Sequence, residues 1–141
     1  MSLFGLLEVS GSALSAQSVR LNTISSNLAN AESVSGTPEG TYKALQPIFS
    51  SVITGGFGGG VGANSLVKVQ VDQVIESDRL PRQEYAPHHP LADEEGYVYY
   101  GNVNAVEEMA NMISASRSYQ NNVEVMNTSK QLLIQTLSLG R

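Results

Sequence analysis

The 141-residue sequence contains no cysteine, which excludes disulfide bonds and metal sites built from thiolates. This absence suits an exported protein, although short chains also lack cysteine by chance. The N-terminus has none of the basic segment, apolar segment and cleavage site of a secretory signal, and no apolar run reaches the roughly 18 residues of a membrane span. We therefore expect no cleaved Sec-type signal and no direct membrane insertion.

Basic charge is also scarce, because the eight lysine and arginine residues are scattered and the net charge is -5. Binding to nucleic-acid phosphates needs a basic stripe, so we expect no nucleic-acid partner. Residues 1–30 contain only two charged side chains and residues 118–141 only three, whereas residues 32–95 contain nine acids and four bases. The middle of the chain is therefore expected to be its solvated part.

The first thirty residues carry leucine at every seventh position, which places these side chains along one side of a helix. We predict a helix over residues 3–30, roughly 40 Å long at 1.5 Å per residue. Outside the leucines, serine, alanine and glycine replace the lysine and glutamate of an ordinary surface helix. Such small, uncharged faces allow other helices to approach closely, so this helix is expected to be surrounded. The leucine seam consists of Leu7, Leu14, Leu21 and Leu28.

A second stripe, mostly apolar, runs through the C-terminal end at steps of three and four residues. Asn104 is a candidate N-cap with Glu107 three residues later, and Gly140 lies where a C-cap glycine is expected. We predict a helix over residues 104–138, roughly 50 Å long. The stripe consists of Met109, Met112, Ser116, Tyr119, Val123, Met126, Lys130, Leu133 and Leu137.

The middle of the chain has the pattern of a β-hairpin. Residues 42–54 and 65–77 are strand candidates, the second because valine alternates with polar residues. The glycine-rich link over residues 55–64 supplies the turn between them. A hairpin is therefore predicted between the two helices.

Residues 76–96 are rich in proline and charge and predict an extended loop, and residues 97–100 predict a short strand. The expected fold is mainly α with a small β segment. The two terminal helices pack as an antiparallel, coiled-coil-like hairpin around a middle of β-hairpin and extended loop. The expected domains are a discontinuous helical domain, residues 1–31 with 104–141, and a middle segment, residues 32–103.

Two features could carry chemistry. Gly58, Gly60 and Ala63 have the spacing of a dinucleotide-binding turn, but the helix that would supply the anion site is missing after them. His88 and His89 lie near acidic residues, but no third ligand has a recognisable spacing. No nucleophile elbow of the G-x-S-x-G type is present. We therefore expect no enzyme, cofactor or metal, and a small nucleotide-dependent enzyme that uses the glycine-rich link is kept as an alternative.

The segments "GSALSAQSVRLNTISSNLANAESVSG", "HPLADEEGYV" and "NVNAVEEMANMISASRSYQNNVEVMNTSKQLLIQTLSLG" together resemble the FlgC family of proximal rod proteins of the bacterial flagellar basal body. The resemblance covers nearly the whole chain. It implies a structural subunit whose terminal helices pack in the inner layer of a helical, tubular drive-shaft that spans the periplasm. It also implies export through the flagellar type III apparatus, and assembly with copies of itself and with other rod and basal-body proteins.

The resemblance places Leu21, Asn22, Asn27, Leu28, Ala29 and Asn30 in the N-terminal rod motif, and Asn102, Asn104, Glu107, Met109, Met112, Arg117, Tyr119, Gln120 and Asn122 in the C-terminal one. Two departures are Asn121, where the family pattern has alanine, and His89, where it has asparagine. Seam and motifs together give the expected assembly interface: Leu7, Leu14, Leu21, Asn22, Ile24, Asn27, Leu28, Asn30, Met109, Met112, Arg117, Tyr119, Gln120, Asn122, Val123, Met126, Leu133 and Leu137.

These expectations specify what each face of the first helix contacts. The leucine seam should meet the C-terminal helix of the same chain, and the serine, alanine and asparagine faces should meet neighbouring subunits that satisfy the asparagine amides. Burial of one leucine seam offsets only part of the conformational entropy lost when the helices order. The ends of a free chain should therefore be loose and should order on assembly. A helical-hairpin adaptor that binds a single partner without polymerising is the alternative.

Overall fold

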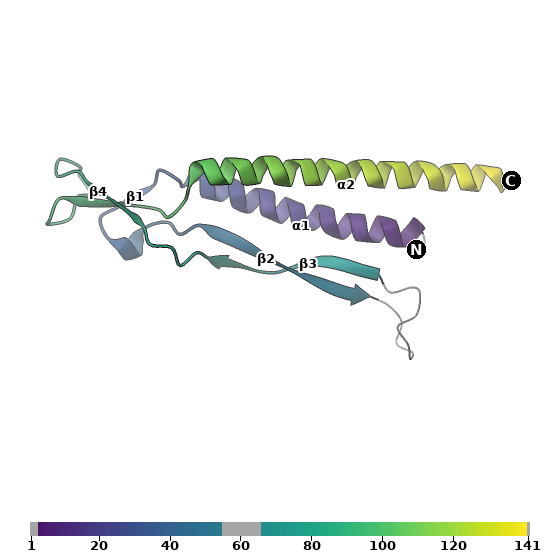
Figure 1. Ribbon diagram of the computed structural model, residues 1–141, viewed down its shortest axis with the longest axis horizontal. Coiled ribbons are helices and arrows are strands. Elements are labelled where there is room, and N and C mark those ends of the chain that lie inside the picture. The colour runs from purple at the N-terminus through teal and green to yellow at the C-terminus, as the bar shows by residue number, and fades with distance from the viewer. Residues whose placement is uncertain (1–2, 55–65, 141) are drawn as a thin grey trace.

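The computed structural model describes residues 3–54 and 66–140, so the predicted glycine-rich link lies outside the described residues. The molecule is elongated, with both chain ends directed to one side and a small sheet at the other (Figure 1). In chain order the elements are α1 (Leu3–Ala29), β1 (Val34–Ser35), the 3-10 turn η1 (Pro38–Gly40), β2 (Leu45–Thr54), β3 (Leu66–Glu76), β4 (Arg82–Tyr85), β5 (Tyr97–Tyr100) and α2 (Ala105–Leu139).

The two terminal helices lie side by side and run in opposite directions (Figure 1). Both helices predicted from the sequence are confirmed to within one residue. Asn104 caps α2 as expected, because its side-chain oxygen accepts hydrogen bonds from the N–H groups of Val106 and Glu107. The longer helix, α2, continues past the N-terminal end of α1 (Figure 1).

β2 and β3 pair antiparallel from Leu45 opposite Glu76 to Thr54 opposite Leu66, which confirms the predicted hairpin. A register shift after Ile48 makes a β-bulge, which is expected to increase the local twist. The hairpin lies along α1 on the side away from α2 (Figure 1). Helix α1 is therefore the middle of three layers.

A three-stranded antiparallel sheet with the order β1-β5-β4 lies beyond the helices. Strand β5 confirms the short strand predicted at residues 97–100. The prediction of a continuous extended loop before it is wrong, because residues 82–85 form β4. Aromatic contacts support this pairing, since the rings of Tyr85 and Tyr97 meet edge to face at 5.3 Å and Arg82 lies 4.6 Å from the ring centre of Tyr100.

Asp93 organises the turn between β4 and β5. Its Oδ1 accepts hydrogen bonds from the N–H groups of Tyr97 and Glu95 at 2.8 and 3.0 Å, and its Oδ2 accepts one from the hydroxyl of Tyr99 at 3.1 Å. Gly96 follows with φ of 84°, a conformation that favours glycine. The Tyr97 N–H, aided by the other donors, lowers the pKa of Asp93 despite an opposing contribution from desolvation.

The core consists mainly of small side chains. Among the described residues, the buried apolar ones are Ala16, Ile24, Ala31, Ala44, Val98 and Ala115, and the buried polar ones are Ser10, Thr23, Asn27, Ser77 and Ser129. Small residues allow the layers to approach closely, but each buries little apolar area. Much of the larger apolar surface is consequently left exposed.

Candidate assembly surface

The two helices differ in how much of their surface the chain itself covers. Helix α1 contacts α2 on one side and both strands of the hairpin on another. Its residues Ser10, Ala16, Thr23, Ile24 and Asn27 are all buried. Over its described length, α2 buries only Ala115 and Ser129. Of the two helices, α2 therefore offers more of its surface to a neighbouring molecule.

The leucine seam of α1 is half-buried at all four positions, Leu7, Leu14, Leu21 and Leu28. Its assignment to the interface between the helices stays a prediction. Ile24 is 4% exposed and belongs to the core. The neighbouring Asn22 is exposed, so it is available to another subunit.

Asn27 and Asn30 find their hydrogen-bond partners within the chain. The side-chain amide of Asn27 donates to the carbonyl of Leu45 at 2.9 Å, and that of Asn30 donates to the carbonyl of Ser26 at 2.8 Å. The expectation that neighbouring subunits satisfy the amide is therefore wrong for Asn27, which is 1% exposed, and stays a prediction for the rest of the Asn30 amide. The asparagines in the sequence were an ambiguous signal. A buried amide needs hydrogen-bond partners, but the sequence does not tell which chain supplies them.

The small-residue face of α1 is also occupied by the chain itself. The Oγ of Ser12 accepts a hydrogen bond from the N–H of Val69 at 3.2 Å, and a side chain at Gly5 would meet Leu66. Glu8 and Lys68 form an ion pair between the same two elements. The hairpin thus covers much of the face of α1 that we expected neighbouring subunits to contact.

The expected interface residues of α2 divide between two faces. One group is half-buried and includes Met126, whose methyl group would lie 3.9 Å from a Cβ added at Gly11 of α1. This contact directs the half-buried side of α2 toward α1. The half-buried group is Met112, Tyr119, Asn122, Val123, Met126 and Leu133.

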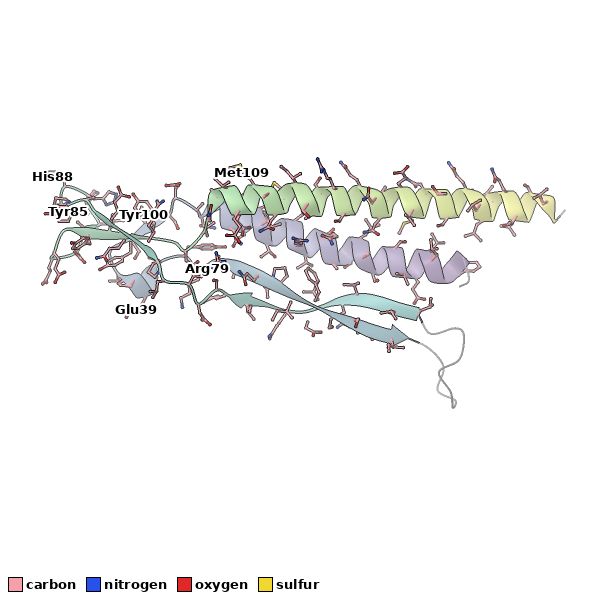
Figure 2. All side chains as sticks on the ribbon, viewed as in Figure 1. Glu39, Arg79, Tyr85, His88, Tyr100 and Met109 are labelled. Carbon is pink, nitrogen blue, oxygen red and sulfur yellow. The ribbon has the colours of Figure 1, made fainter. Side chains whose placement is uncertain are left out.

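The second group lies on an exposed side of α2. Met109, Arg117 and Gln120 are exposed, and Met109 projects from the side turned away from α1 (Figure 2). Sequence reasoning missed two members of this surface, Val106 and Ile113, which are 73% and 57% exposed. All five positions follow the steps i, i+3, i+7, i+11 and i+14, so they share one face. We call Val106, Met109, Ile113, Arg117 and Gln120 the open face.

A further apolar surface lies where α2 passes the end of α1. Leu137, an expected interface residue, is 72% exposed there, and Leu132, Ile134 and Leu139 are also exposed. Residues 132–139, which we call the overhang, contain no charged side chain. Large exposed apolar surfaces of this kind are typical of protein–protein contacts.

Of the other candidate residues, His89 has a local structural role. The Nδ1 of His89 accepts a hydrogen bond from the N–H of Leu91 at 3.1 Å. Within residues 3–54 and 66–140, no group of three or more His, Asp or Glu side chains is placed to hold a metal ion. Neither described helix combines the length and hydrophobicity that crossing a membrane requires.

Known proteins resemble this chain along its whole length. Residues 7–36 match the family model for the flagella basal body rod protein, and residues 94–139 match that for the flagellar basal body rod FlgEFG protein C-terminal region. The chain is 47% identical to the flagellar basal-body rod protein FlgC of Escherichia coli O6:H1 and 36% identical to that of Bacillus subtilis. Each of these alignments covers 100% of both proteins.

Proposed function

The chain belongs to the FlgC family of flagellar basal-body rod proteins, and from that premise we propose that it joins the rod through exposed surfaces of its two terminal helices. It is a structural subunit of the bacterial flagellar basal body. This family membership replaces the alternatives of a non-polymerising adaptor and a nucleotide-dependent enzyme, and we assign the chain no catalytic activity.

The observation that carries this proposal is the open face of α2. It presents Val106, Met109 and Ile113 to solvent with Arg117 as its single charged member. Full burial of a side chain such as Val, Ile or Met contributes about 1.5–3 kcal/mol, so covering this face supplies a substantial driving force for association. The overhang adds a second apolar surface at the other end of the helix.

We further propose a division of labour between the parts of the chain. Residues 1–31 and 104–141 form the rod-core part, in which the helices pack in a coiled-coil-like manner and contact copies of the chain and other rod proteins. Residues 32–103 form the outward part. The contact between α1 and the hairpin supports treating the two parts as one folded unit. We propose export through the type III apparatus and a position in the rod within the periplasm, without a nucleic-acid partner.

The test is to place a charge on the open face. Ile113→Asp should leave the helicity of the purified chain nearly unchanged, because this side chain is exposed, but should sharply reduce incorporation into basal bodies and swimming. Ser114→Asp introduces the same charge at an adjacent exposed position about 100° around the helix and is the matched control. Equal incorporation of both variants would contradict a role for the open face.

A further inference from the structure

Two asparagine side chains hold the chain where the hairpin leaves the rest of the molecule. Asn27, in the last turns of α1, is 1% exposed. Its Oδ1 accepts hydrogen bonds from the N–H of Leu45 at 2.8 Å and from the hydroxyl of Tyr42 at 3.0 Å, while its Nδ2 donates to the carbonyl of Leu45 at 2.9 Å. The amide thus binds both backbone groups of the first residue of β2, as a paired strand would.

Asn102, in the segment before α2, holds the neighbouring residue Ala44. Its Oδ1 accepts a hydrogen bond from the N–H of Ala44 at 2.6 Å, and its Nδ2 donates to the carbonyls of Ser77 and Arg79 at 3.0 and 2.7 Å. The preceding Gly101 is buried, and a Cβ there would lie 2.8 Å from the carbonyl oxygen of Tyr42. The segment before α2 is therefore fitted closely against the start of β2.

Farther along, the hairpin packs on α1 where Leu66 approaches the buried Gly5, but its polar contacts with α1 there are more exposed than those of Asn27. Ser12 meets Val69 in an exposed hydrogen bond, and the Glu8 side chain of the ion pair with Lys68 is 49% exposed. Exposed pairs hold orientation weakly. At about 3.3 Å per residue, the eleven residues of β3 extend roughly 35 Å along α1, so a small rotation at the junction would shift the contacts of the far end with α1 by several ångströms.

We propose that Asn27 and Asn102 are positioning residues for rod assembly, which fix the direction of the β2–β3 hairpin relative to both helices. Their pairing with Leu45 and Ala44 brings together the end of α1, the start of β2 and the segment before α2. The hairpin consequently adopts its place only when the ends of the two helices at this junction have formed. This inference rests on the proposed rod function, because it concerns the shape in which the subunit is presented to its neighbours.

The absence of native cysteine allows the hairpin direction to be measured with two specific labels. Spin labels at Ser15→Cys on α1 and Val67→Cys on β3 occupy exposed positions, and their separation reports the direction of the hairpin. In the purified full-length chain we expect one narrow distance distribution. Asn27→Ala and Asn102→Ala should each broaden it at least about twofold, because the buried junction is lost. Asn127→Ala, at an exposed asparagine of α2, should leave it unchanged.

A second readout separates positioning from direct contact with neighbours. In cells, incorporation of Asn27→Ala and Asn102→Ala into basal bodies should fall by about tenfold, because the subunit is no longer preorganised. Unchanged distance distributions with lost incorporation would overturn the proposal, since the residues would then act on neighbours directly. A broad distribution in the parent, normal incorporation of both variants, or loss of helical circular dichroism in both would also overturn it. Absence of the parent chain from basal bodies would instead refute the proposed function.

Discussion

Helix α1 and helix α2 look alike in sequence, because both carry few charges and many small polar residues, yet they occupy different environments. Helix α1 lies between α2 and the hairpin, whereas the extensive packing of α2 is with α1. Ile24 of α1 is buried, while Ile113 of α2 is more than half exposed. The same type of residue therefore serves the fold in one helix and is available for assembly in the other.

This difference also changes how an uncharged helix is interpreted. Small residues on α1 are explained largely by the hairpin of the same chain, through contacts such as those at Gly5 and Ser12. Within the part of the chain that the structure describes, no such layer covers the exposed Val106 and Met109 of α2. Contacts within the chain thus explain the composition of α2 less fully than that of α1.

The largest effect is a difference in the free energy of unfolding between two variants, in which Ile24 or Ile113 is replaced with alanine. Ile24→Ala removes a buried side chain and should lower the free energy of unfolding of the purified chain by about 2–5 kcal/mol. Ile113→Ala removes an exposed one and should change that free energy by less than about 0.5 kcal/mol, while still reducing incorporation into basal bodies. Urea denaturation and immunoblots of basal bodies measure the two quantities.

If Ile24→Ala and Ile113→Ala lower the free energy of unfolding of the isolated chain by similar amounts, the contrast between α1 and α2 is wrong. Such a result would mean that α2 is packed on its open face even without neighbours. Leu91→Ala, at an exposed position outside both helices, serves as a control for nonspecific effects of removing apolar area.

The second prediction concerns the looseness expected at both ends of the free chain, which we confine to the overhang because α1 is packed between α2 and the hairpin. Exposed backbone with few packed neighbours opens most easily, so the amides of residues 132–139 should exchange faster than those of residues 16–27 in dilute monomer. In the assembled rod, protection should extend to the overhang. Hydrogen exchange with peptide resolution tests this. Equal, strong protection of both segments at concentrations where sedimentation shows a monomer would refute coupling between ordering and assembly.

The parts of this fold that the sequence predicts are those with local signals. Asn104 specifies the start of α2 because a cap acts on N–H groups two and three residues away. Alternating valines specify β3 in the same way, since strand periodicity is read within one segment. Strand β4 carries no such alternation in "RQEY" and depends on pairing with β5, so it was not predicted.

The candidate site likewise combines features that a local sequence pattern predicts with features that depend on residues far along the chain. The stripe through Met112 and Met126 indicates a buried side of α2, but Ala115, which is fully buried, adds no bulky apolar signal to the pattern. The partner of Asn27 is Leu45, eighteen residues away, and no local pattern identifies it. Which face of a helix is left open thus depends on the fold of the middle segment.

The smallest effect is expected from a change in the three-stranded sheet. This sheet lies beyond both helices, so a change there should leave the difference between α1 and α2 unaltered. Hydrogen bonding to the ionised carboxylate holds the pKa of Asp93 in the folded state below its ordinary value, which is about 3.9 in unfolded peptides. The folded state therefore binds the proton less readily than the unfolded state. The resulting stabilisation is fully present above the ordinary pKa and is lost as pH falls through the lowered one.

Replacing Asp93 with asparagine removes this pH-dependent contribution. The difference in melting temperature between the parent and Asp93→Asn should be largest near neutral pH and should shrink as pH falls below about 4. Glu94→Gln, a neutralisation of the exposed neighbouring residue, should show a smaller dependence on pH. Exchange rates in α1 and α2 should stay unequal in both variants, because the turn at Asp93 is remote from the helix contacts. A difference in melting temperature that is the same at pH 2.5 and pH 7 would show that the carboxylate charge of Asp93 does not stabilise the turn.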